Sequence, residues 1–310
     1  MTPSYLALLQ EAVIETDAIA QHYYTKRDLV VSQKSDLSPV TIADQEIEQT
    51  LTQFFRKYLP DAAILGEEYG ASEIPRAKPF DLISPYSAPP SKGRLRVIID
   101  PIDGTRNFVR GIPFVATLVA IEQEGHIIAG IVSNPIQREQ WSAEKGQGAT
   151  YNGRPISVSK IAHLSESQAF HGSLYGPEAE GLPRDKVLNI LSQTPRQRAI
   201  GDFYGHMLVA SGAGEFSLDF GMKPWDIAPL KIIVEEAGGR VTNGAGGFSL
   251  EVRSLVCSNG VLQQSPPCAA SLRNSSRPPH SLPLTTATTI PIPAPSFSCF
   301  NTTQSGNITG

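Results

Sequence analysis

Val97-Ile98-Ile99-Asp100-Pro101-Ile102-Asp103-Gly104-Thr105 is the most informative stretch of this chain. Its apolar start predicts a short buried strand, and two carboxylates follow that strand directly. Pro101 bends the chain, and Gly104 permits a tight turn into the next element. Asp100, Asp103 and the carbonyl oxygen of Ile102 can then converge on one point. Such oxygen ligands suit Mg²⁺, which leaves positions open for water and phosphate.

A solvated Asp-Pro turn, in which Asp103 caps the next element, would explain the same residues without a metal. The flanking Gly-Thr pair and the acids elsewhere in the chain favour a metal site instead. If Gly104 and Thr105 open a helical turn, their backbone N–H groups could hold phosphate oxygens.

Three further acidic motifs are each weak alone. Gly66-Glu67-Glu68 follows the strand-like run 62–65, and a surface loop would explain it equally well. Asp226 lies before a predicted helix and could be only an N-cap. Asp44 follows a possible N-cap, Thr41, and could serve only the helix dipole.

Composition excludes several function classes. The chain has 310 residues and a net charge of −4, with no basic block, which argues against nucleic acid and polybasic membrane binding. No apolar run approaches the roughly 18 residues of a membrane span, and the first residues do not resemble a signal peptide, so we expect a cytoplasmic protein. The three cysteines lack the spacing of a zinc site or a disulfide framework.

Hydrophobic periodicity predicts mixed helices and strands, which fit an α/β or α+β layered fold. Residues 71–93 hold five prolines and indicate a loop. Residues 265–310 contain eight prolines and no Asp or Glu, which predicts a disordered tail after a catalytic domain over 1–264. The predicted helices span 6–24, 43–58, 203–211 and 228–236, and the predicted strands span 29–31, 62–65, 96–99, 115–122, 126–133, 216–220 and 240–242.

Deletion of residues 265–310 should leave activity intact, because a segment of this composition buries too little apolar surface to support the core. Activity and solubility of the truncated chain test this expectation. An insoluble or inactive product would contradict it.

Together, the order Thr-x-Ala-Asp, Gly-Glu-Glu, Asp-Pro-Ile-Asp-Gly-Thr and Trp-Asp-x-Ala resembles the inositol monophosphatase family of Mg²⁺-dependent, often lithium-sensitive phosphatases. The resemblance runs from about Leu6 to Leu262, and its Asp-Pro-Ile-Asp-Gly-Thr element is highly specific. It implies a layered αβαβα sandwich of the inositol monophosphatase and sugar phosphatase type, and a homodimer.

The resemblance also implies roles for individual residues and two or three Mg²⁺ ions. Glu67, Asp100 and the Ile102 carbonyl would bind the first ion. Asp100, Asp103 and Asp226 would bind the second, and Glu67 would also hold the ion or water shell of a third. Thr105 paired with Asp44 would activate the attacking water.

Four segments resemble the histidinol-phosphatase branch of this family: 34–44, 107–113, 201–205 and 222–226. In that branch Asp202 could attract the ammonium group of the substrate, and Asp219 matches a substrate-contacting acid. Asp202 could instead be a helix N-cap. Lys223 and the long 71–93 loop depart from the branch and leave its specificity open.

We therefore expect a phosphomonoesterase acting on a small phosphate ester, first of all histidinol phosphate in histidine biosynthesis. An inositol-1-monophosphatase with the same chemistry is the main alternative. A catalytically inactive binding protein on the same fold is a second alternative. A nucleotide 3′-phosphatase is a distant third, because no base-binding feature is evident.

Overall fold

Strand β5 (Leu95–Asp103) carries the Asp-Pro-Ile-Asp sequence and lies inside an eight-stranded sheet. The computed structural model describes residues 4–26, 31–33, 39–72, 94–176, 179, 182–244, 246–251 and 253–262. The sheet is ordered β10-β9-β8-β7-β6-β5-β3-β4, and β3 runs parallel to β5 whereas β6 runs antiparallel to it. Its other strands are β3 (Ala63–Gly66), β4 (Gly70–Ser72), β6 (Ala116–Gln123), β7 (His126–Asn134), β8 (Glu139–Glu144), β9 (Ala149–Tyr151) and β10 (Arg154–Ile156).

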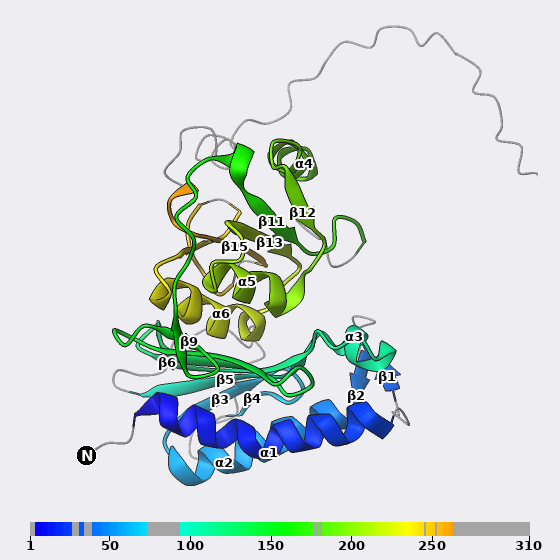
Figure 1. Cartoon of the computed structure of the whole chain (residues 1–310). Coiled ribbons are helices and arrows are strands. Elements are labelled where there is room, and N and C mark those ends of the chain that lie inside the picture. The colour runs from blue at the N-terminus through cyan, green and yellow to red at the C-terminus, as the bar shows by residue number, and fades with distance from the viewer. Residues whose placement is uncertain are drawn as a thin grey trace, which may run out of the picture. The chain divides into compact units, whose positions relative to one another are not determined.

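Helices α1 (Tyr5–Lys26) and α2 (Ile42–Tyr58) cover one face of this sheet (Figure 1). Because side chains alternate along a strand, Val97 and Ile99 of β5 point to this face. They pack against a helical stripe that includes Leu9 and Leu51. A two-stranded sheet, β1 (Val31–Gln33) with β2 (Pro39–Thr41), precedes α2.

The opposite face of the sheet packs on α5 (Asp202–Ala210) and α6 (Pro224–Glu236) (Figure 1). Ile98, the residue between Val97 and Ile99, belongs to this second core, together with Phe203 of α5 and Ile233 of α6. One strand therefore contributes to two hydrophobic layers. This fixes β5 deep in the protein, where the carboxylates that follow it are partly shielded from water.

A second, five-stranded sheet lies beyond α5 and α6, ordered β12-β11-β13-β15-β14. Helix α4 (Arg184–Ser192) packs on it through Val187, Ile190 and Leu191. The layers alternate as αβαβα, as predicted. The strands of this sheet are β11 (Gln168–His171), β12 (Arg196–Arg198), β13 (Phe216–Phe220), β14 (Arg240–Thr242) and β15 (Ser254–Ser258).

The predicted helices and strands lie where the structure has them, but several of them begin or end at other residues. The predicted strand 96–99 continues through Asp103, because a local register shift accommodates Pro101 within β5. Helix α6 begins at Pro224 rather than 228, since proline is compatible with the first helical turn. Strands β2, β4, β8 to β12 and β15 and helix α4 were not predicted.

Three predictions fall wholly or partly on residues that the structure does not describe. Strand β4 occupies the start of the predicted 71–93 loop, which is a correction, and 73–93 lie outside the described residues. The predicted strand 29–31 overlaps β1 at Val31 only, and 29–30 are outside as well. The predicted boundary at 264 and the tail 265–310 also lie outside. Among the described residues, no helix is long and apolar enough to cross a membrane.

Candidate active site

Three carboxylates meet at the end of β5. Oxygen atoms of Asp100, Asp103 and Asp226 all lie within 4.8 Å of one another. In a regular strand, residues three apart point to opposite faces. Here Asp100 pairs with Leu118 and Asp103 with Ala116, so β5 contains one residue more than β6 between these pairs. This bulge brings both acids to one side.

Asp226 reaches the cluster from the first turn of α6. Its Oδ2 accepts a hydrogen bond of 2.7 Å from the backbone N–H of Lys223, the residue before the helix. Asp226 is therefore the third residue of a capping arrangement and not the N-cap that the sequence also allowed. This contact leaves Asp226 Oδ1 for another partner.

Glu67 follows β3, the parallel neighbour of β5, and its backbone N–H donates to the Ile99 carbonyl at 3.2 Å. The turn that begins at Glu67 is stabilised by Glu48, a fully buried acid of α2. The Glu48 carboxylate accepts from the backbone N–H groups of Glu68 at 2.7 Å and Tyr69 at 3.0 Å. Glu48 was not predicted as a site residue, although an acid on the apolar face of a predicted helix was a usable signal.

Gly66→Ala should weaken Mg²⁺ binding. A Cβ at this position would lie 1.9 Å from Glu48 Oε1, so the Glu48 carboxylate must move and the Glu67 turn loses its support. We expect a several-fold higher Mg²⁺ concentration for half-maximal activity and about 1–3 kcal/mol less stability.

A Mg²⁺ titration of phosphatase activity and a thermal melt measure the two effects. Gly247→Ala is the matched control, because the nearest atom to its Cβ would be 3.8 Å away. Equal Mg²⁺ dependence of both variants would contradict the role given to the Glu48 support.

Thr105 and Asp44 meet as the family resemblance implies. Gly104 is the N-cap of the short helix α3 (Thr105–Arg110), so the expected helical turn is present. The Thr105 hydroxyl lies 3.3 Å from Asp44 Oδ1 and 2.9 Å from the Ile102 carbonyl. Asp44 Oδ2 accepts from the backbone N–H and hydroxyl of Thr41, at 2.8 and 2.6 Å. The capping contact thus orients a fully buried carboxylate toward Thr105.

The acid cluster is electrostatically strained. Burial, and then the charges of Glu67, Asp103 and Asp226, raise the pKa of Asp100 well above its ordinary value. Burial, followed by Asp202 and Asp226, raises the pKa of Asp103. Burial and Glu67 raise the pKa of Asp226 to about 7, although the Lys223 N–H opposes them. Carboxylates this close cannot all ionise without a compensating cation.

These residues fit a hard divalent cation. The ligand atoms are carboxylate oxygens, and Asp100 Oδ1 is buried with no hydrogen-bond partner among the described residues. Glu67 is not one of the three clustered acids. Its charge nevertheless raises the pKa of Asp100 and of Asp226 more than any other neighbouring charge does. Oxygen-rich sites with this much negative charge are the preferred environment of Mg²⁺.

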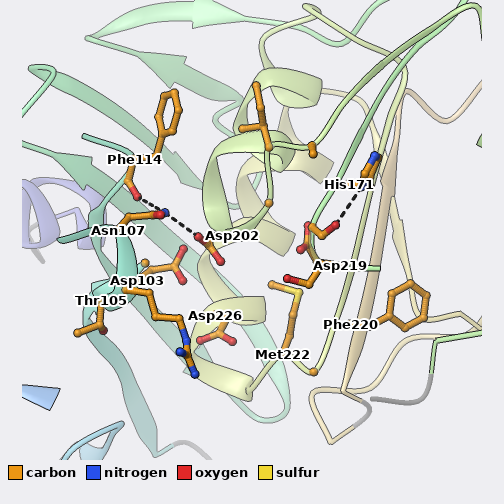
Figure 2. A pocket seen from close by; sticks show the side chains of 18 of the residues that line it. Asp103, Thr105, Asn107, Phe114, His171, Asp202, Asp219, Phe220, Met222 and Asp226 are labelled. Carbon is orange, nitrogen blue, oxygen red and sulfur yellow. Dashed lines mark hydrogen bonds between the residues drawn. The ribbon is translucent and has the colours of Figure 1, made fainter. Parts of the chain in front are cut away.

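A pocket of about 690 Å³ opens beside the cluster. Figure 2 shows Asp103, Thr105 and Asp226 on one side, Asp202 next to Asp103, and Asp219 farther along. Asp202 is the first residue of α5, and Gly201 is its N-cap, so the N-cap alternative for Asp202 is wrong. The predicted residues that line the pocket are Glu67, Asp103, Gly104, Thr105, Asp202, Asp219 and Asp226, whereas Asp44, Asp100 and Ile102 do not line it.

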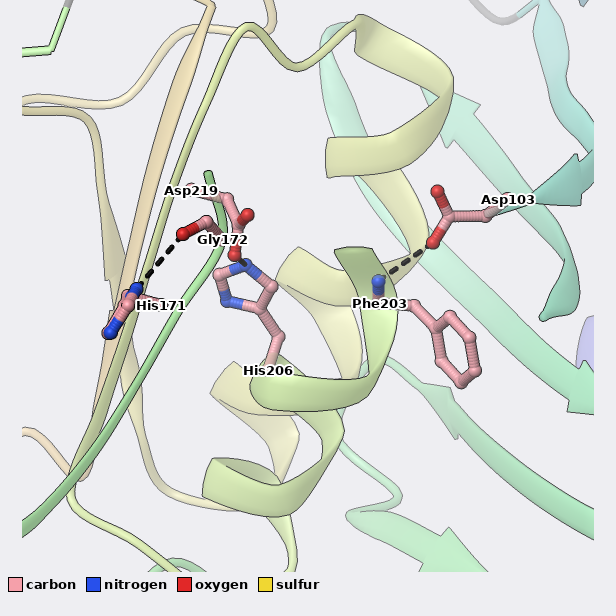
Figure 3. A network of polar contacts seen from close by, with 6 residues as sticks. All are labelled: Asp103, His171, Gly172, Phe203, His206 and Asp219. Carbon is pink, nitrogen blue, oxygen red and sulfur yellow. Dashed lines mark hydrogen bonds and ion pairs between the residues drawn. The ribbon is translucent and has the colours of Figure 1, made fainter. Parts of the chain in front are cut away.

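Two contacts between distant segments were not predictable from the motifs (Figure 3). The backbone N–H of Phe203 donates to Asp103 Oδ2 at 2.7 Å, which ties α5 to the acid cluster. His206 Nε2, fully buried, lies 3.1 Å from Asp219 Oδ2. Burial lowers the pKa of His206, but Cys257 and Asp219 raise it more, to about 10.

The layered fold and the shared carboxylate site define a metal-dependent phosphatase. The sequence matches the model of the inositol monophosphatase family over residues 4–277, and the chain belongs to this family of phosphoric monoester hydrolases.

Two histidinol-phosphatases and one solved structure are similar to this chain over most of its length. The chain is 36% identical over 267 residues to a histidinol-phosphatase of Chlorobaculum parvum, covering 84% of this chain and 94% of the relative. It is 35% identical over 251 residues to a histidinol-phosphatase of Mycobacterium tuberculosis, covering 79% and 90%. The solved structure of an IMPase from Thermotoga maritima is 30% identical, with a TM-score of 0.69, covering 83% of this chain and 92% of that one.

Proposed function

We propose that this chain hydrolyses histidinol phosphate with two or three Mg²⁺ ions. The observation that carries this is Asp202 on the pocket wall beside the metal-type cluster, with Asp219, which is paired with His206, also lining the pocket. A cationic amino alcohol benefits from an anionic wall, whereas an uncharged polyol needs only hydrogen bonds. The histidinol-phosphatase relatives support the same substrate.

The proposed ligand sets are those that the family resemblance implies. Glu67, Asp100 and the Ile102 carbonyl would hold one ion, and Asp100, Asp103 and Asp226 another, with Glu67 contributing to the shell of a third. Bound ions would lower the pKa of a water molecule and offset charge on the phosphoryl and leaving oxygens.

The other residues position the reactants. The Thr105 hydroxyl has one proton and two acceptors within reach, the Ile102 carbonyl and Asp44. With the Ile102 carbonyl bound to an ion, the proton would go to Asp44, and the Thr105 oxygen would accept from the attacking water. The Gly104 and Thr105 backbone N–H groups would hold phosphate oxygens. Asp202 and Asp219 would orient the amino alcohol. A homodimer and a cytoplasmic location stay predictions.

The test is phosphate release from histidinol phosphate and from inositol 1-phosphate, each with and without Mg²⁺. We expect Mg²⁺-dependent release with a clear preference for histidinol phosphate. A preference for inositol 1-phosphate would establish the alternative substrate. The observation that favours this alternative is the positive charge of Lys223 close to Asp226, which would disfavour a cationic substrate. No release from either ester would indicate an inactive binding protein.

A further inference from the structure

Asn107, the third residue of α3, connects the segment after β5 to the first residue of α5. Its Nδ2 lies 3.1 Å from the Phe114 carbonyl and 3.1 Å from Asp202 Oδ2 (Figure 2). A carboxamide has two N–H donors, so both are used. The flipped amide would turn its oxygen toward two acceptors, so these contacts also fix its orientation.

The Asp202 carboxylate lies close to another acid of the site. Its charge acts on Asp103, and like charges at short range repel each other. Its backbone has φ of +55°, in the left-handed region that non-glycine residues adopt rarely. The next residue, Phe203, is fixed by its N–H bond to Asp103. The backbone thus places Asp202 beside a group that repels its side chain.

Gly104 makes room for the contact. A Cβ at Gly104 would lie 3.3 Å from Asn107 Nδ2, 3.5 Å from Asp202 Oδ2 and 2.7 Å from the Phe114 carbonyl. The hydrogen bond between Asn107 and Asp202 therefore lies close to the turn at Gly104, whose backbone N–H group is proposed to hold the phosphate. Asn107 thus links the Gly104 turn to the Asp202 side of the pocket.

We propose that Asn107 is a positioning residue, which holds the Asp202 carboxylate in the pocket so that it can bind the cationic group of the substrate. This inference rests on the proposed function, because it takes Asp202 as the group that recognises a cationic ester. Asn107 acts through Asp202 and does not itself select the substrate.

The experiment compares kcat/KM for histidinol phosphate with kcat/KM for 4-nitrophenyl phosphate, an ester without a cationic group, at saturating Mg²⁺. The ratio of the two values is independent of the fraction of folded enzyme. We expect Asn107→Ala to lower this ratio about tenfold, mainly through KM for histidinol phosphate, since a hydrogen bond to a charged group is lost. Asp202→Asn, which keeps the shape and tolerates the left-handed backbone, should lower it at least as much.

The decisive comparison is the double variant. If Asn107 acts through Asp202, Asn107→Ala should change the ratio less than about twofold in the Asp202→Asn background. Independent, multiplicative losses would overturn the positioning role. So would an equal loss for both esters, or a loss in kcat alone.

Two further outcomes separate the possible failures. If Asp202→Asn lowers the ratio and Asn107→Ala does not, only the positioning role fails. If neither variant changes it, the cation-binding role of Asp202 fails as well. Asn107→Ser covers the case in which Asn107→Ala does not fold, and loss of folded protein in both variants would make Asn107 a structural residue and overturn the proposal.

Discussion

Asp100→Asn is expected to lower kcat by at least about a thousandfold, because it removes the charge that both proposed ions share. The side chain is buried, and its Oδ1 has no hydrogen-bond partner among the residues described. Removal of several kcal/mol of charge stabilisation from the transition state produces a loss of this size. Phosphate release at saturating Mg²⁺ measures it.

Stability should change in the opposite direction. Burial and the neighbouring acids raise the pKa of Asp100, so in the metal-free protein its ionised form is unfavourable above its ordinary pKa. The asparagine that replaces it cannot ionise, and we expect the melting temperature of the variant in EDTA to stay equal or to rise. Asp185→Asn, on the exposed start of α4, is the matched control and should keep full activity. Undiminished turnover in Asp100→Asn would contradict the ligand assignment.

Thr105→Val should be the second most damaging change, with a loss in kcat of about a hundredfold or more. Valine keeps the branched shape of threonine but removes the hydroxyl that contacts Asp44. In the proposed mechanism, the attacking water would lose the hydroxyl that accepts its hydrogen bond and that Asp44 orients. Steady-state kinetics on the preferred ester provide the measurement.

Thr105→Ser is the control for this change, since it restores the hydroxyl without the methyl group. We expect serine to retain activity within about tenfold of the threonine enzyme, because the donor and acceptor are both present. If valine and serine gave the same kcat, the Thr105 hydroxyl would have no part in activating water.

Much of the fold was predictable from long, strongly patterned elements. The stripe on α2 and the apolar start of β5 are long enough to indicate their type, and Thr41 and Pro60 mark the ends of α2. The second sheet was harder, because β12, Arg196–Arg198, is a short and fully exposed edge strand with no apolar signal. Short strands gain their stability from neighbours that the local sequence does not reveal.

The acids of the site were predictable, and their geometry was not. Nothing in the spacing of Asp100 and Asp103 shows that a bulge turns them to one side. The Phe203 N–H reaches Asp103 across 100 residues of sequence. The left-handed backbone of Asp202 places its carboxylate in the pocket, and the sequence analysis could weigh that residue only as a cap or a substrate contact. Such contacts depend on tertiary packing.

The shared-metal arrangement is tested most directly by an anomalous difference map from crystals of the full chain soaked in Mn²⁺, which prefers the same oxygen ligands as Mg²⁺. We predict at least two peaks within bonding distance of carboxylate oxygens, with Asp100 contacting both and Asp103 and Asp226 contacting one. Peaks located elsewhere, or none at all beside these three side chains at saturating Mn²⁺, would contradict it.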